Sequence, residues 1–382
     1  MSSISFGSRE RVGIVGAGIV GLAHAWSAAQ RGHRVQVFER TSLATGASIR
    51  NFGMIWPIGQ PAGEWQAVAL RSRAAWLELS QRAGVWVHDR GSLHLAHRAD
   101  EWAVLEEFAQ LNSATTNSIK LLSRDAVLAC CPAANPTNLI GGLFSSTELG
   151  VNPRTASATI AAWLAEHYGV EFHWNTAVVA VEDGVVRTAD NRHSRCDRVV
   201  VCGGADFAAL FPELLRAAGM KRCKLQMLKT APQPQGWQSG PHIASGLTLR
   251  HYANFAHCLS LVALKERIAH ETPELDQFGI HVMASQNDRG EMILGDSHEY
   301  DAEISPFDST VIDDLMLREL RKLIHLPDWT ITQRWHGSYA KHPTQPFYSA
   351  EPQPRTHICT GLGGAGMTMS FGVAERLWEQ WT

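Results

Sequence analysis

A glycine pattern near the N-terminus constrains the fold of this 382-residue chain more than any other feature of its sequence. The run Gly16-Ala17-Gly18-Ile19-Val20-Gly21 spells G-x-G-x-x-G between an apolar, strand-like segment at 11–15 and a segment with helical spacing at 19–31. In a β-α-β unit the first glycine permits a tight turn, the second lets backbone amides approach a pyrophosphate, and the third lets helix and strand pack closely. A second strand, expected at 34–38, ends at Glu39, whose carboxylate can accept a hydrogen bond from a ribose hydroxyl. The first forty residues therefore predict a dinucleotide-binding unit.

Two later segments of small residues bear on which dinucleotide is bound. The loop at 45–53 lets the backbone come close to a large planar ring. Far away in the sequence, Gly361-Leu362-Gly363-Gly364-Ala365-Gly366-Met367-Thr368 predicts a second glycine-rich turn between a strand and a helix. Its amides can face the N1–C2=O edge of a flavin, where a helix N-terminus stabilises the negative charge of the reduced ring. An NAD-dependent dehydrogenase has no evident need for this turn, so the pattern favours FAD, with a purely structural bend as the alternative.

The composition excludes several classes of function. Lys plus Arg number 34 against 37 for Asp plus Glu, which makes nucleic acid and acidic membranes poor candidates as partners. The seven cysteines show no C-x-x-C spacing, and no histidine pair has metal-binding spacing, so we expect no metal site and no disulfide framework. Residues 1–10 lack the apolar core of a signal peptide, and no stretch approaches 18 uncharged apolar residues. We therefore expect a cytoplasmic protein.

The order of the expected elements indicates an α/β fold, α+β overall. Helices are expected at 64–82, 100–111, 153–168, 309–324 and 367–378, and strands at 91–96, 195–202, 280–285, 291–294 and 356–360. The middle, 221–304, is dominated by alternating and aromatic runs that suit an antiparallel sheet. We predict a Rossmann-like FAD-binding domain assembled from 1–90, 147–222 and 335–382. A β-rich substrate-binding domain is predicted to comprise 91–146 and 223–334.

The sequence resembles the FAD-dependent amine and amino-acid oxidases of the D-amino-acid oxidase, glycine oxidase and sarcosine oxidase type over nearly its whole length. The resemblance is carried by Gly16–Gly21 with Glu39, the Gly46-Ala47-Ser48 loop, Pro153-Arg154, Val199–Gly204, Gly295-Asp296, Trp335-His336-Gly337 and Gly361–Met367. More narrowly, Ser48–Gln60 and Gly91–Leu95 look like a bacterial subgroup associated with phosphonate breakdown, which is thought to oxidise 2-aminoethylphosphonate or its N-methyl form. The family resemblance implies hydride-like transfer from the amine-bearing carbon to flavin, followed by hydrolysis of the imine.

The same resemblance implies a set of cofactor contacts. The residues expected to contact FAD are Gly16, Ala17, Gly18, Ile19, Val20, Gly21, Glu39, Arg40, Ala47, Ser48, Arg50, Asn51, Phe52, Gly53, Gly203, Gly204, Gly361, Gly363, Gly364, Ala365, Gly366, Met367 and Thr368. Sarcosine-oxidase relatives attach flavin to a cysteine shortly after the tryptophan motif, and no cysteine occurs between Trp335 and Lys341. We therefore predict that FAD is held non-covalently.

One departure from the family bears on the substrate. Relatives that oxidise glycine or D-amino acids carry a W-x-G-x-R motif whose arginine clamps the substrate carboxylate, and Tyr339 stands where that arginine would fall. The absence of this clamp disfavours an ordinary α-amino acid and is compatible with another anion, such as a phosphonate. The predicted substrate-site residues are Arg50, Arg250, His251, Lys341, Tyr339 and, for its place in the motif, His336.

Several alternatives stay open on the sequence alone. The chain can oxidise glycine, sarcosine or a D-amino acid, can be an NAD-dependent dehydrogenase, or can be a non-catalytic FAD-binding subunit. The sequence leaves the oxidant undecided between O2 and another electron acceptor, and it does not give the oligomeric state. Lys229 and Lys265 are candidates for an oxygen-activating lysine.

Overall fold

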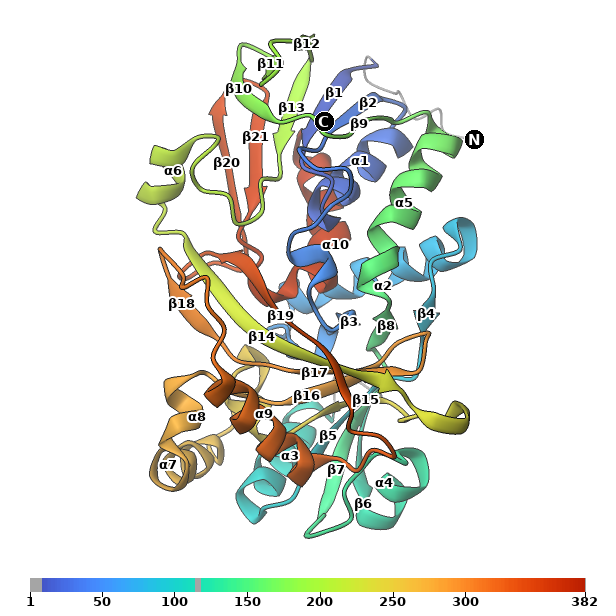
Figure 1. Ribbon diagram of the computed structural model, residues 1–382, viewed down its shortest axis with the longest axis vertical. Coiled ribbons are helices and arrows are strands. Elements are labelled where there is room, and N and C mark those ends of the chain that lie inside the picture. Colours follow the sequence, from blue (N-terminus) through green and yellow to red (C-terminus); the bar gives the residue numbers. More distant parts are fainter. Residues whose placement is uncertain (1–8, 114–117, 382) are drawn as a thin grey trace.

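A computed structural model describes residues 9–113 and 118–381 of the chain. Figure 1 shows a region built on a mostly parallel sheet at one end of the long axis and a region built on a large, mostly antiparallel sheet at the other. Mixed α/β architecture was predicted and is confirmed. Predicted pieces 1–90, 91–146 and 335–382 include residues 1–8, 114–117 and 382, which lie outside the described residues.

The first region contains a sheet with the strand order β20-β21-β13-β1-β2-β9, in which the strands from β21 to β9 are parallel and β20 is antiparallel. Its strands are β1 (Arg11–Val15), β2 (Arg34–Phe38), β9 (Glu171–His173), β13 (Arg198–Val201), β20 (Tyr348–Gln353) and β21 (Thr356–Thr360). Helices α1 (Ile19–Gln30), α2 (Glu64–Ala83), α5 (Pro153–Tyr168) and α10 (Gly366–Trp381) accompany it, and α10 packs on both α1 and α2. Chain segments from both ends of the sequence thus share one core around Ile14, Leu22 and Trp378.

The second region contains a sheet with the order β18-β14-β17-β16-β15-β5-β7-β6, and β19 pairs with β14 outside this path. Its strands are β5 (Ser92–Ala96), β6 (Ile119–Ser123), β7 (Gly141–Ser145), β14 (Lys221–Pro232), β15 (His242–Ala244), β16 (Met283–Gln286), β17 (Glu291–Gly295), β18 (Glu299–Asp301) and β19 (Ile331–Lys341). All pairs are antiparallel except β15 with β5. Helices α3 (Ala99–Asn112), α4 (Arg124–Cys130), α7 (Leu261–Glu271), α8 (Pro273–Gln277) and α9 (Thr310–Leu323) pack around it (Figure 1).

The remaining strands form two small sheets. One has the order β10-β11-β12, with β10 (Val178–Glu182), β11 (Val185–Thr188) and β12 (His193–Arg195). The other joins β3 (Met54–Ile55), β8 (Leu149–Val151) and β4 (Val87–His88). The short helix α6 (Pro212–Ala217) lies between β13 and β14 in the sequence.

The prediction for the middle of the chain was incomplete. The antiparallel strands are present, but α7 and α8 interrupt them within 221–304. Leu261, Leu264 and Ile268 of α7 are buried at helical spacing, a short signal that the surrounding alternating runs obscured. Strand β19 also crosses the predicted domain boundary at 335. The division into the discontinuous domains stays a prediction. Within the described ranges, no helix combines the length and apolar character that crossing a membrane requires.

Candidate active site

The first glycine turn is close-packed and joined to the end of β2. A Cβ atom at Gly21 would lie 1.9 Å from the carbonyl oxygen of Gly16, and Gly16 itself has φ +100°. The buried Glu39 carboxylate accepts hydrogen bonds from the amide of Ala17 at 2.9 Å and from the amide and hydroxyl of Thr41 at 3.1 and 2.7 Å. The predicted β-turn-α-β unit therefore forms as expected, and Glu39 fixes the turn as well as closing the strand.

The loop that follows β2 reaches back to the N-terminus of α1. The amide of Ile19 donates to the hydroxyl of Ser48 at 2.9 Å, so this serine meets one of the amides that the helix leaves without an internal partner. Asn51 holds the loop together, donating to the carbonyls of Ala47 and Ser48 and accepting from the amide of Gly53 at 2.7 Å. Gly53 has φ +75°, and a Cβ there would lie 2.0 Å from the carbonyl of Val151. Asn51 and Gly53 thus shape the loop through contacts within the protein.

In the second glycine turn, no side chain packs closely against Gly364 or Gly366. Gly361 and Gly363 have φ of +76° and +61°, and the 3-10 helix Gly363–Ala365 leads directly into α10. A Cβ at Gly364 would first meet the Tyr339 hydroxyl at 3.5 Å, and one at Gly366 would meet nothing within 4 Å. Behind this turn, Thr368 accepts a hydrogen bond from the amide of Trp56 and the carbonyl of Met367 from the indole of Trp76, both at 2.9 Å.

The surroundings of the first glycine turn and of the loop after β2 fit a dinucleotide cofactor. Two cavities share Ile49 and Arg154: one of about 440 Å³ includes Ala17 of the first glycine turn, and one of about 550 Å³ includes Arg50, Trp335 and His336. At the end of β13, the carbonyl of Gly204 accepts a hydrogen bond from the Thr360 hydroxyl at 2.9 Å. Among the other predicted cofactor contacts, Arg40 is paired with Asp206 at 2.6 Å.

The predicted substrate-site residues fall into two groups. Arg50 and His336 line the larger cavity, where His336 Nδ1 lies 2.8 Å from a carboxylate oxygen of Asp308. Tyr339 stands three positions along β19 from His336, so the two side chains leave opposite faces of the strand. Lys341 lies on the Tyr339 side, beside the second glycine turn, and His251 lies near Lys341.

Tyr339 and Lys341 form a polar cluster beside the second glycine turn. Tyr339 is buried opposite Cys223 in the β14–β19 pair. The ammonium of Lys341 lies 3.5 Å from the Tyr300 hydroxyl and 4.6 Å from the centre of its ring, and the lysine stem passes within 3.7 Å of a Cβ placed at Gly363. Burial raises the pKa of both tyrosines, so their hydroxyls are hydrogen-bond donors at neutral pH. Burial also raises the pKa of Cys223 to about 12, which leaves this thiol protonated and unreactive.

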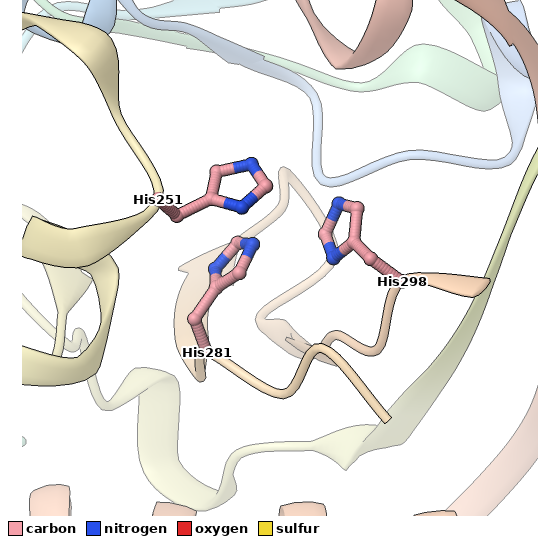
Figure 2. Close-up of side chains that lie close together, drawn as sticks. All are labelled: His251, His281 and His298. Atoms are coloured by element: carbon pink, nitrogen blue, oxygen red, sulfur yellow. The ribbon is translucent and has the colours of Figure 1, made fainter. Parts of the chain in front are cut away.

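Three histidines lie close together next to this polar cluster, and the sequence did not predict that they would. His251, at the end of a 3-10 helix, meets His281, before β16, and His298, between β17 and β18 (Figure 2). The ring centres of His298 and Tyr339 are 6.4 Å apart. The three histidines are too far apart in sequence to form a motif, so only the tertiary fold reveals the cluster.

The remaining predicted cations are engaged elsewhere. Arg250 is paired with Asp276 at 2.5 Å and donates to the carbonyl of Ile280 at 2.8 Å. Lys229 is paired with Glu291, and Lys265 is exposed on α7. This leaves Lys341 as the predicted cation beside the second glycine turn.

Comparison with known proteins places the chain in a family. The family model described as "FAD dependent oxidoreductase" matches residues 11–380. A thiamine-biosynthesis oxidoreductase, ThiO, of Rhizobium etli is 31% identical over 220 residues, which span 56% of this chain and 60% of that protein. A subunit of the opine oxidase of Rhizobium meliloti is 22% identical over 343 residues, covering 86% of this chain and 81% of that protein. The crystal structure of glycine oxidase from Bacillus cereus superposes with a TM-score of 0.75 at 18% identity, covering 98% and 96% of the two chains.

Proposed function

The chain belongs to the FAD-dependent oxidoreductase family, and from this premise we propose that it oxidises the carbon–nitrogen bond of a small amine that bears a separate anionic group. The observation that carries the proposal is that Tyr339 and Lys341 both lie beside the second glycine turn, with the Lys341 ammonium 3.5 Å from the Tyr300 hydroxyl. The family's carboxylate clamp is absent there, and a single flexible ammonium with two tyrosine hydroxyls takes its place.

The protein segments available to hold FAD are the two glycine turns and the loop at 46–53. The N-terminus of α1 is suited to the pyrophosphate, because its free amides and positive dipole end favour an anion. The second turn precedes α10 and offers a similar helix N-terminus to the flavin ring. When bound, FAD accepts the hydride that leaves the amine-bearing carbon of the substrate. No cysteine occurs between Trp335 and Lys341, and burial raises the pKa of the nearby Cys223, so we propose that the cofactor is held without a covalent bond.

The proposed substrate is 2-aminoethylphosphonate or its N-methyl derivative. Lys341 can donate to a phosphonate oxygen, and the hydroxyls of Tyr300 and Tyr339 can add hydrogen bonds without requiring planar, bidentate geometry. Oxidation removes a hydride from carbon and a proton from nitrogen. Water then hydrolyses the resulting imine to phosphonoacetaldehyde and ammonia, or methylamine for the N-methyl substrate. The electron acceptor that completes the cycle is O2 or a redox partner.

Product analysis tests this proposal. The purified protein is incubated in air, and with an artificial electron acceptor, with each of 2-aminoethylphosphonate, N-methyl-2-aminoethylphosphonate, glycine, sarcosine and D-alanine. We expect phosphonoacetaldehyde and one amine in equal amounts from the phosphonates, with much lower turnover of the amino acids. Preferred turnover of an amino acid would contradict the proposed substrate while leaving the oxidoreductase assignment intact.

A further inference from the structure

The three clustered histidines form a site that the flavin chemistry does not require. Their candidate ligand atoms lie within 4.8 Å of one another, and the ring centres are 3.8 Å apart for His251 and His281 and 4.5 Å for His281 and His298. Figure 2 shows the rings converging from three separate segments, with nitrogens directed into the space between them. We propose that His251, His281 and His298 bind a divalent transition-metal ion of the zinc class.

The ring nitrogens are available as ligands. His281 and His298 are 3% and 8% exposed, and burial lowers the pKa of both, whereas His251 is exposed. The two buried rings are therefore neutral at physiological pH, the state that binds metal. Within the described part of the chain, neither ring nitrogen of His281 has a hydrogen-bond partner, and Nδ1 of His298 has none. Buried polar atoms without partners are costly, and a metal ion would satisfy them.

A buried carboxylate stands behind two of the rings. Asp296 is 5% exposed, and its oxygens lie 3.7 Å from Nδ1 of His281 and 3.8 Å from Nε2 of His298. Both distances are longer than a hydrogen bond, but they place the carboxyl on the side of His281 Nδ1 and His298 Nε2, which leaves His281 Nε2 and His298 Nδ1 to face an ion. A carboxylate on the far nitrogen of a metal-binding histidine orients the ring and raises its basicity. We therefore assign Asp296 as a positioning residue.

The donor set selects the class of ion. Three neutral imidazoles suit zinc, copper, nickel or iron and are poor ligands for calcium or magnesium, which prefer oxygen. Three protein ligands also leave at least one coordination position for water or another small ligand. The ammonium of Lys341 opposes a cation here, and burial raises the pKa of Asp296 well above its usual value, so the binding of an ion would have to be coupled to loss of the proton from this carboxyl. An alternative occupant is an anion, held by Lys341 and the histidine N–H groups.

Metal analysis of the flavin-containing protein tests the site without any activity measurement. The protein is stripped with a chelator, dialysed against zinc buffered by a competing chelator, and assayed for zinc and flavin. We expect a single zinc ion per chain in the wild type. With cobalt instead, we expect visible d–d bands at wavelengths longer than the flavin absorption.

Matched variants locate the ion. His251→Gln removes an exposed ligand and should abolish stoichiometric zinc binding, whereas His257→Gln changes an exposed histidine six residues away and should leave it unchanged. Asp296→Asn keeps all three ligands and should weaken zinc affinity about 10- to 100-fold. Flavin content and thermal unfolding report whether each variant is folded.

Two results would overturn the inference. One is a folded wild-type protein that binds no stoichiometric zinc or cobalt. The other is zinc binding that is equal in His251→Gln and His257→Gln. Binding of inorganic phosphate that depends on His251 in zinc-free protein, together with no metal uptake, would assign the cluster to an anion instead.

Discussion

Lys341 is the residue on which the proposed substrate recognition depends most. Removing its charge with Lys341→Met should lower kcat/KM for 2-aminoethylphosphonate about 10- to 100-fold, because a hydrogen bond to a charged group contributes about 1.5–3 kcal/mol. The effect should appear mainly in KM, since Lys341 is proposed to hold the anion before and during the reaction. Lys265→Met, on the exposed side of α7, is the matched control and should change neither parameter. Equal kinetics for Lys341→Met and wild type would remove this lysine from the site.

Gly21 tests the close packing of the first glycine turn. Gly21→Ala places a methyl group 1.9 Å from the carbonyl of Gly16, so the turn and α1 must separate. We expect a loss of about 1–3 kcal/mol in the free energy of unfolding, as for other overpacked sites, and weaker flavin retention. Gly46→Ala is the control, because a Cβ there meets nothing within 4 Å. Urea unfolding measures the free energy of unfolding of both variants. Equal values for Gly21→Ala and Gly46→Ala would show that the turn accommodates the methyl group without loss of stability.

Residues differ in how well the sequence alone reveals them. Gly16, Gly21 and Glu39 were predictable because their roles depend on neighbours close in sequence. His281, His298 and Tyr300 were not, since His281 lies far in sequence from the other two, and all three acquire their neighbours only when β16 pairs with β17 and β14 pairs with β17, β18 and β19. Arg250 was predicted as an anion ligand, but the fold brings Asp276 to its guanidinium.

At the level of elements, α1 depends on a side chain from another segment. Ser48→Ala removes the hydroxyl that accepts from the amide of Ile19, and we expect the flavin-free protein to lose about 1 kcal/mol of unfolding free energy, as when a helix cap is removed. Ser157→Ala, in α5, is the comparison: its buried hydroxyl has no hydrogen-bond partner within the described residues, so its loss should not destabilise the protein. Chemical denaturation of the two flavin-free variants measures the difference. A larger loss in Ser157→Ala would contradict the role given to Ser48.

Long, strongly patterned elements were predictable, and short ones were not. Helix α5 and strand β21 begin and end where the sequence predicts, because Pro153 and Gly169 bound the helix and glycine follows the strand. Helix α8 and strands β3, β4 and β18 are only a few residues long, so their pattern carries no period, and tertiary pairing determines their structure. Strand β19 brings together segments of both regions, which the predicted boundary at 335 had separated.

For the whole molecule, buried histidines should couple stability to pH. Burial lowers the pKa of His94 to about 3, against about 6.5 in an unfolded chain. Between about pH 3 and pH 6.5, His94 binds a proton in the unfolded chain but not in the native protein. The free energy of unfolding therefore decreases as pH falls below about 6.5. Well below that pH, His94 alone should contribute about 1.4 kcal/mol per pH unit. His94→Gln should flatten the dependence of the unfolding free energy on pH by this amount, and His257→Gln should not. Parallel curves for His94→Gln and wild type would show that His94 is protonated in the native state.

The most direct test of the proposed function is anaerobic reduction of the bound flavin in the wild-type protein. Visible spectra are recorded without oxygen before and after addition of 2-aminoethylphosphonate, then of glycine, with dithionite as the control for a reducible flavin. We predict that the phosphonate bleaches the flavin bands and that glycine leaves them nearly unchanged. A flavin that dithionite reduces but that 2-aminoethylphosphonate does not bleach would contradict the proposed function.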